Sequence, residues 1–246
     1  MPQTPTPEPA PTPEPDDGIR TIAFAVYPGI TPLDLVGPLQ VCSALADLVP
    51  GFRTVVVGER IEPMPTDTPL ALIPSHTFAE VPAPHVLIVP GGLAPTLAAM
   101  ADESLLEHIR RTAGQARIVG SVCTGSLLLA AAGLLEGRRA TSHWMYRDLL
   151  ARFGATPVAE RWVEDGHFVT AAGVSSGIDM ALQLVSRIAG EEVARQIQLF
   201  IEYDPEPPFG PIDWTAVGTP EHTGFASAVL AQALTDHPEL LARLTG

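Results

Sequence analysis

Hydrophobic residues occur along the chain in two kinds of run, and the two kinds alternate. Short continuous runs of apolar and β-branched residues predict strands buried on both faces. These runs lie at residues 21–27, 54–57, 86–89 and 118–122. Longer segments whose apolar residues recur every three or four positions predict helices. These segments lie at residues 33–48, 103–113, 178–188 and 191–203. Alternating strands and helices predict an α/β fold, with a mostly parallel sheet covered by helices on both faces.

Weaker patterns fill the remaining positions. Residues 70–73 and 77–78 indicate a small hairpin or an edge insertion, and residues 137–141 another short element. A helix is expected over residues 145–153. Two strands at 158–163 and 167–170 are expected to form a hairpin around Glu164-Asp165-Gly166. From Pro220 onward we expect one or two helices.

A cysteine stands where the strand at 118–122 meets the next apolar run. Cys123 is followed by Thr124 and Gly125, so the pattern predicts a sharp turn from a strand into a helix that starts at Thr124. The N-terminus of that helix would point its N–H groups at the sulfur and favour the reactive thiolate. The competing interpretation is a cysteine that packs as a small hydrophobe in the core.

Two further segments follow predicted strands. Asp34 comes after the first strand, and Gly91-Gly92 comes after the strand at 86–89. Because the carboxyl ends of parallel strands share one edge of a sheet, we expect these residues to converge with Cys123. Asp34 could otherwise be a first-turn acid of its helix, and the glycines a plain turn. The convergence is the argument for an enzyme.

Composition and charge exclude several classes of function. Of the 246 residues 46% are hydrophobic, which is ample for a core. A formal net charge of −14 argues against a nucleic-acid or anionic membrane partner. The apolar run at residues 118–135 is long enough for a membrane span, but its serines, threonine and glycines favour the strand-turn-helix interpretation.

The chain contains two cysteines, Cys42 and Cys123, which is too few for a disulfide framework. Cys42 lies in an apolar helical stripe and is expected to pack in the core. We interpret both as reduced thiols of a cytoplasmic protein, and the N-terminus shows no signal-peptide pattern. Residues 1–18 are proline-rich and predicted to be a disordered tail; residues 19–210 form the α/β domain, and 211–246 a helical extension packed on it.

Several segments resemble the ThiJ/PfpI superfamily and, within it, the isocyanide hydratase branch. The likeness spans about residues 22–209 and rests on the following stretches: Leu33-Asp34-Leu35-Val36-Gly37-Pro38, Pro90-Gly91-Gly92, Ser121-Val122-Cys123-Thr124-Gly125-Ser126, Ala140-Thr141-Ser142-His143-Trp144, Gly177-Ile178-Asp179, Glu202-Tyr203 and Pro207-Pro208-Phe209. The resemblance implies a flavodoxin-like three-layer sandwich with a cysteine elbow, a homodimer, and no metal or organic cofactor.

The resemblance also implies a chemistry. Cys123 would attack the terminal carbon of an isocyanide while Asp34 supplies the proton, and Asp34 would then activate water to release an N-substituted formamide. Thr124 would hold Asp34 or the water through its hydroxyl. Backbone N–H groups of Gly92 and Thr124 would bind developing charge. Substrate contacts are further expected at Gly91, Leu35, His143 and Trp144.

His143 leaves room for another interpretation. It follows Cys123 at the distance where amidotransferase-like relatives place a base, yet a structural or wall role is expected here. Two rival functions stay open. One is a non-catalytic sensor resembling the domains of AraC-type regulators, although the residues after Phe209 are few and acidic. The other is a different cysteine-dependent hydrolase or glyoxalase of the same superfamily. Other histidines show no spacing typical of metal ligands.

Overall fold

The computed structural model describes residues 18–246, so the predicted tail lies outside the described residues apart from Gly18. A seven-stranded sheet runs through the centre in the order β10-β11-β7-β6-β1-β2-β5. Every pairing in it is parallel except that of β10 with β11. Its strands are β1 (Arg20–Ala25), β2 (Phe52–Gly58), β5 (His76–Thr77), β6 (Val86–Val89), β7 (Ile118–Val122), β10 (Trp162–Asp165) and β11 (Phe168–Ala171). The expected α/β sandwich is confirmed.

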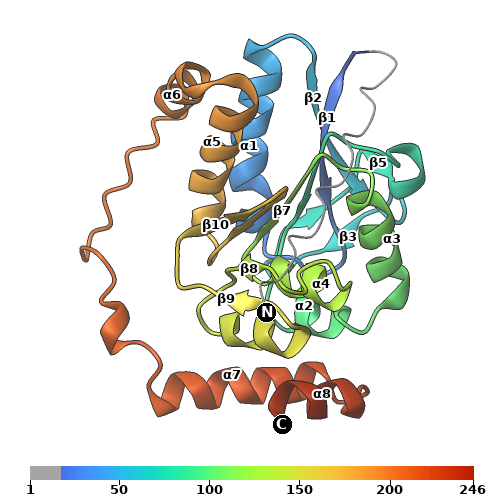
Figure 1. The fold of residues 1–246 in the computed structure, drawn as a ribbon, viewed down its shortest axis with the longest axis vertical. Helices are drawn as coiled ribbons and strands as arrows, with labels where there is room; N and C mark the ends of the chain where they lie inside the picture. The colour runs from blue at the N-terminus through green and yellow to red at the C-terminus, as the bar shows by residue number, and fades with distance from the viewer. Residues whose placement is uncertain (1–17) are drawn as a thin grey trace, which may run out of the picture.

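Helices cover both faces of the sheet (Figure 1). On one face α1 (Pro32–Leu48), α5 (Ser176–Ala189) and α6 (Glu191–Phe200) pack together. On the other lie α2 (Ala94–Ala99), α3 (Glu103–Ala113) and α4 (Gly125–Ala131). The inner strands are therefore buried on both sides, which explains why their sequences are continuous apolar runs.

The smaller elements differ in part from the sequence prediction. The hairpin joins β3 (Met64–Pro65) to β4 (Ala71–Leu72), closed by a Thr66 N–H to Leu70 carbonyl bond, and β5 joins the edge of the main sheet. The expected helix at 145–153 is a 3₁₀ helix, η2 (Arg147–Phe153). Its buried Leu150 and Phe153 lie three residues apart, which suits a 3₁₀ turn. Other short elements are η1 (Phe78–Glu80), η3 (Trp214–Ala216), β8 (Arg139–Ala140) and β9 (Thr156–Pro157).

The C-terminal part forms an arm followed by two helices. Every residue from 204 to 216 is exposed, and the arm stands away from the sheet and its helices (Figure 1). At its start the Tyr203 hydroxyl donates to Asp179. Beyond it α7 (Pro220–Ala233) packs against α2, and α8 (Pro238–Thr245) against η2. In the part of the chain described here, no helix is long and apolar enough to cross a membrane.

Candidate active site

The predicted site residues meet at the carboxyl edge of the sheet. From β1 the chain builds outward through β2 to β5, then returns to the other side of β1 with β6 and β7. This reversal between β1 and β6 is where open α/β sheets bind ligands. Asp34 lies in the first turn of α1, Gly91-Gly92 follow β6, and Cys123 follows β7. The predicted convergence of three segments is therefore present.

Cys123 adopts a strained backbone conformation. Its φ is 58°, a left-handed value that a residue with a Cβ atom rarely takes. Two serine hydroxyls, Ser126 at 3.1 Å and Ser142 at 3.0 Å, donate to its carbonyl oxygen. Its N–H donates to the carbonyls of Ala171 and Ala172 at the end of β11. Surrounding hydrogen bonds thus hold the elbow in a conformation that costs free energy, as is common at functional sites.

The elbow packs directly on the backbone that follows β6. A Cβ atom on Gly125 would lie 2.1 Å from the Val89 carbonyl oxygen. A Cβ atom on Gly91 would lie 2.6 Å from the Thr124 nitrogen. Because real side chains do not reach such distances, these positions require glycine for close approach. The helix itself begins at Gly125 rather than at Thr124.

Asp34 is a buried carboxylic acid beside the cysteine. Its side chain is 0% exposed, and neither oxygen has a partner in good hydrogen-bond geometry within residues 18–246. Burial raises the pKa of Asp34 to about 7. Looser interactions with the Cys123 thiol and the Gly91 N–H offset part of that rise, and the charge of Asp67 adds to it. Such a carboxyl exchanges protons near neutral pH.

The thiol differs from its sequence-based expectation. Burial and then the Asp34 charge raise the pKa of Cys123, while the N–H groups of Thr124 and Val174 lower it. The elbow N–H groups therefore act in the expected direction, but desolvation dominates and the isolated thiolate is disfavoured. Cys123 and Asp34 influence each other's pKa, so that ionising both at once is unfavourable. The side chain of Cys123 is 4% exposed, so only an edge of it is accessible.

Of the two contacts expected of the Thr124 hydroxyl, the one to Asp34 is absent and the one to water stays a prediction. Its hydroxyl donates to the Gly92 carbonyl at 2.5 Å and accepts from the Gly92 N–H at 3.0 Å. The expected hydrogen bond to Asp34 is therefore not formed. The Gly92 N–H is also occupied, which leaves the N–H groups of Thr124 and Val174 beside the sulfur. Val174 was not singled out from the sequence; the small residues at 171–177, between β11 and α5, are the signal that could have indicated it.

The remaining predicted residues surround the elbow. Leu35 is buried in the core, behind the first turn of α1. His143 packs its ring against Gly173, and burial lowers its pKa. No hydrogen bond joins it to Cys123 or Asp34 in the described chain. Its neighbour Trp144 lies 5.6 Å from it, ring to ring, and 5.4 Å from His222 of α7. Their expected role as a wall stays a prediction.

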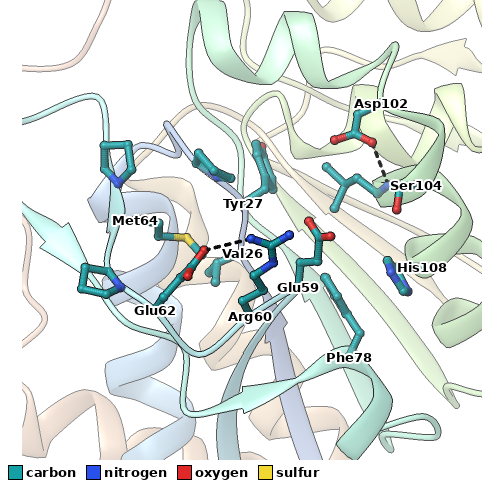
Figure 2. A pocket seen from close by; sticks show the side chains of 14 residues that line it. Val26, Tyr27, Glu59, Arg60, Glu62, Met64, Phe78, Asp102, Ser104 and His108 are labelled. Atoms are coloured by element: carbon teal, nitrogen blue, oxygen red, sulfur yellow. Dashed lines mark hydrogen bonds and ion pairs between the residues drawn. The ribbon is translucent and has the colours of Figure 1, made fainter.

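A separate pocket of about 380 Å³ lies along the same edge of the sheet, beyond Tyr27. Its lining contains none of the predicted site residues. Figure 2 shows Tyr27 and Phe78 among its lining residues, with the exposed side chains of Arg60 and Glu62 forming an ion pair. In residues 18–246 there is no group of three or more histidine, cysteine, aspartate or glutamate side chains that could hold a metal ion.

Comparisons with known proteins agree with this geometry. Residues 20–187 match the model of the DJ-1/PfpI family. Isonitrile hydratase of Pseudomonas putida is 46% identical over 188 residues, which cover 76% of this chain and 80% of that protein. The HTH-type transcriptional regulator CdhR of Pseudomonas aeruginosa is 29% identical over 180 residues, 71% of this chain and 52% of that protein.

Among solved structures, the fold is similar to that of a ThiJ/PfpI family protein from Pseudomonas syringae. The TM-score is 0.81 at 37% sequence identity, over 93% of this chain and 91% of that chain. The match includes most of the arm and the C-terminal helices. On the family match over residues 20–187 and these relatives, the chain belongs to the DJ-1/PfpI family.

Proposed function

We propose that this protein hydrates an isocyanide to an N-substituted formamide. The observation that carries the proposal is the Cys123–Asp34 pair, in which a buried carboxyl group with a pKa of about 7 faces a thiol. The reaction needs a nucleophile for the terminal carbon and a group that both gives and takes a proton. The similarity to isonitrile hydratase of Pseudomonas putida supports the same reaction.

The first half of the reaction forms a covalent intermediate. The shared proton moves from the Cys123 sulfur to Asp34, and the sulfur attacks the terminal isocyanide carbon. Asp34 delivers its proton to that carbon, so that a thioimidate with a new C–S bond forms. The N–H groups of Thr124 and Val174 stabilise negative charge on the sulfur before attack.

The second half consumes water. The Asp34 carboxylate takes a proton from a water molecule, and the resulting hydroxide adds to the thioimidate carbon. The same proton passes to the substrate nitrogen. Asp34 then removes the hydroxyl proton as the C–S bond breaks, and returns it to the sulfur. One water is added in all, and the enzyme regains its shared proton.

The shape of the site favours this substrate class over larger ones. Cys123 is 4% exposed, and Asp34 is closed off completely. An isocyanide ends in a single unsubstituted carbon atom, which needs little access to reach a sulfur that is almost completely buried. A peptide bond carries a chain on both sides and requires a wider cleft.

The test is mass spectrometry of the protein mixed with a small alkyl isocyanide. The expected result is a transient adduct on Cys123 followed by release of the formamide. Cys123→Ala should lower turnover at least roughly 10³-fold, because the nucleophile is lost. Cys42→Ala is the matched control, since Cys42 is the other buried thiol and lies in α1. Normal turnover by Cys123→Ala would exclude the mechanism.

A sensor is the second candidate, because the regulator CdhR is 29% identical over 180 residues. A sensor of this kind would bind a small molecule at the same edge without turnover. Specific retardation of a DNA fragment by this chain, together with no formamide production, would favour it. Greater peptidase or glyoxalase activity than isocyanide hydration would favour another cysteine-dependent enzyme.

We also propose a homodimer in the cytoplasm, with residues 211–246 as an extension of a single domain. Exposed apolar side chains on the arm support an interface between copies, with Phe209 98% and Trp214 58% exposed. Both cysteines are free thiols, which is typical of a reducing compartment.

A further inference from the structure

The loop after β6 is fixed by one hydrogen bond at each of three consecutive carbonyl groups. Two donors come from the connection between β1 and α1, and the third comes from the residue after Cys123. The pairs are Tyr27 hydroxyl to Pro90 at 2.9 Å, Thr31 N–H to Gly91 at 2.9 Å, and Thr124 hydroxyl to Gly92 at 2.5 Å. The orientation of each peptide plane in this loop is thereby set from outside the loop.

The first of these planes carries the N–H group that faces Asp34. The Pro90 carbonyl and the Gly91 N–H belong to one trans peptide unit, so they point in opposite directions. The Gly91 N–H interacts with the Asp34 carboxyl. A donor that anchors the Pro90 carbonyl therefore also orients the N–H at Asp34.

The anchoring hydroxyl is itself held in place. The Tyr27 oxygen lies 2.9 Å from the Thr96 hydroxyl. A phenol has one proton, which goes to the Pro90 carbonyl, so Thr96 must be the donor to Tyr27. The result is a buried chain of two hydrogen bonds, from Thr96 through Tyr27 to the Pro90–Gly91 peptide, in which each bond polarises the next. The N–H at the far side of that peptide makes a looser interaction with Asp34.

We propose that Tyr27 is a positioning residue, whose hydroxyl holds the Pro90–Gly91 peptide so that the Gly91 N–H points at Asp34. The role rests on the proposed function, in which Asp34 carries the proton. Tyr27 touches neither substrate nor sulfur, and acts through a single peptide unit.

Few titratable side chains lie close enough to Asp34 to affect its pKa. The titratable groups that act on it are Cys123 at the elbow and Asp67 on the loop between β3 and β4, and Tyr27 senses the same groups. Asp67 accepts a hydrogen bond from the Thr31 hydroxyl. On α5, Asp179 is paired with Arg161. Tyr27 carries no charge at neutral pH, and it is connected to Asp34 through the Pro90–Gly91 peptide.

The test is Tyr27→Phe, which keeps the ring that forms a wall of the adjacent pocket and removes the hydroxyl (Figure 2). An N–H donor favours the ionised carboxylate, so losing its orientation raises the pKa of Asp34. Infrared titration follows the band of the protonated carboxyl, assigned by its absence in Asp34→Asn. The midpoint should rise by roughly half to one pH unit.

Two further variants make the result specific. Thr96→Val removes the hydroxyl group that donates to Tyr27. It should also raise the midpoint of the Asp34 titration, but by less than Tyr27→Phe does. If Tyr27→Phe does not fold, the Thr96→Val variant still tests whether Tyr27 positions the peptide. Tyr146→Phe is the matched control, because it deletes another buried tyrosine hydroxyl that donates to a backbone carbonyl, that of Ala226. Its midpoint should not move.

An unchanged midpoint in Tyr27→Phe, or an equal rise in Tyr146→Phe, would overturn the proposal. The acidic limb of the turnover profile should move with the infrared midpoint. The infrared readout requires no turnover. A chain that hydrates no isocyanide while Tyr27→Phe still shifts Asp34 would refute the proposed function and support the positioning role.

Discussion

A buried carboxyl group without a good hydrogen-bond partner costs folding free energy, and Asp34 is such a group. The cost depends on pH because only the ionised form is strongly penalised. The pKa of Asp34 is raised from 3.8 to about 7, so the folded state binds a proton that the unfolded chain has released. Stability is therefore highest at low pH in this window and falls as pH rises toward 7.

The fall in stability with rising pH gives a prediction for Asp34→Asn. Between about pH 4 and pH 7 the wild type should lose stability on the order of 4 kcal/mol from this group, whereas the amide does not ionise. Denaturant unfolding at both pH values measures the difference. At pH 8 the variant should be the more stable protein, and its turnover should be lower by at least roughly 10²-fold.

Asp148→Asn serves as the control, because it removes an exposed carboxyl group beside Arg147, where an ion pair contributes little to the free energy of unfolding. Equal slopes for wild type and Asp34→Asn would mean that the Asp34 carboxyl is not destabilised by burial. Loss of activity together with gained stability would identify Asp34 as a residue retained for chemistry.

At the scale of elements, the site depends on how closely α4 approaches β6. Gly125 opens α4 directly against the Val89 carbonyl, whereas Gly224 lies in α7 with nothing within 4 Å of an added Cβ. The same substitution should therefore have opposite effects in the two helices. Helix propensity favours alanine at both positions. At Gly125, however, the clash of the added methyl group with the backbone after β6 outweighs that preference.

Gly125→Ala is expected to destabilise the fold by at least about 3 kcal/mol, because two backbones must separate. Gly224→Ala should stabilise it by roughly 0.5–1 kcal/mol. Thermal or denaturant unfolding of the two variants beside wild type provides the comparison. A stable, active Gly125→Ala protein would contradict the close approach of elbow and sheet.

For the whole molecule, the unusual feature is an arm that holds only turns and the short helix η3 and stays exposed along its length. Residues 204–216 are exposed throughout, and they include Phe209, Ile212 and Trp214. An extended segment with large apolar side chains in water is unfavourable unless another surface covers it. A second copy of the chain is the partner proposed above.

Sedimentation should therefore show a dimer at micromolar concentration. The double variant Phe209→Asp/Trp214→Asp should weaken association at least roughly 100-fold, because charges replace two aromatic side chains that the proposed interface would bury. Ile61→Asp is the control, since Ile61 is equally apolar and 53% exposed but lies in the turn after β2. A monomeric wild type, or equal weakening by Ile61→Asp, would exclude the arm as the interface.

The sequence by itself determined the layered α/β fold and the positions of the elbow and its acid. Short continuous apolar runs that alternate with amphipathic segments predict strands covered on both sides, and strand polarity then brings Asp34, Gly91 and Cys123 to one edge. It also indicated the small residues at Gly91 and Gly125, whose need for close approach the backbone distances explain.

Only the tertiary structure decided the contacts and charges within the site. The partner of the Thr124 hydroxyl, the N–H of Val174 and the role of Tyr27 depend on distances between segments far apart in the chain. The thiol illustrates the physical reason. A local pattern predicts a helix N-terminus that lowers its pKa, but desolvation by the whole fold and the nearby carboxyl raise it. How far the fold desolvates this one sulfur depends on the assembled molecule, and the local pattern around Cys123 does not specify it.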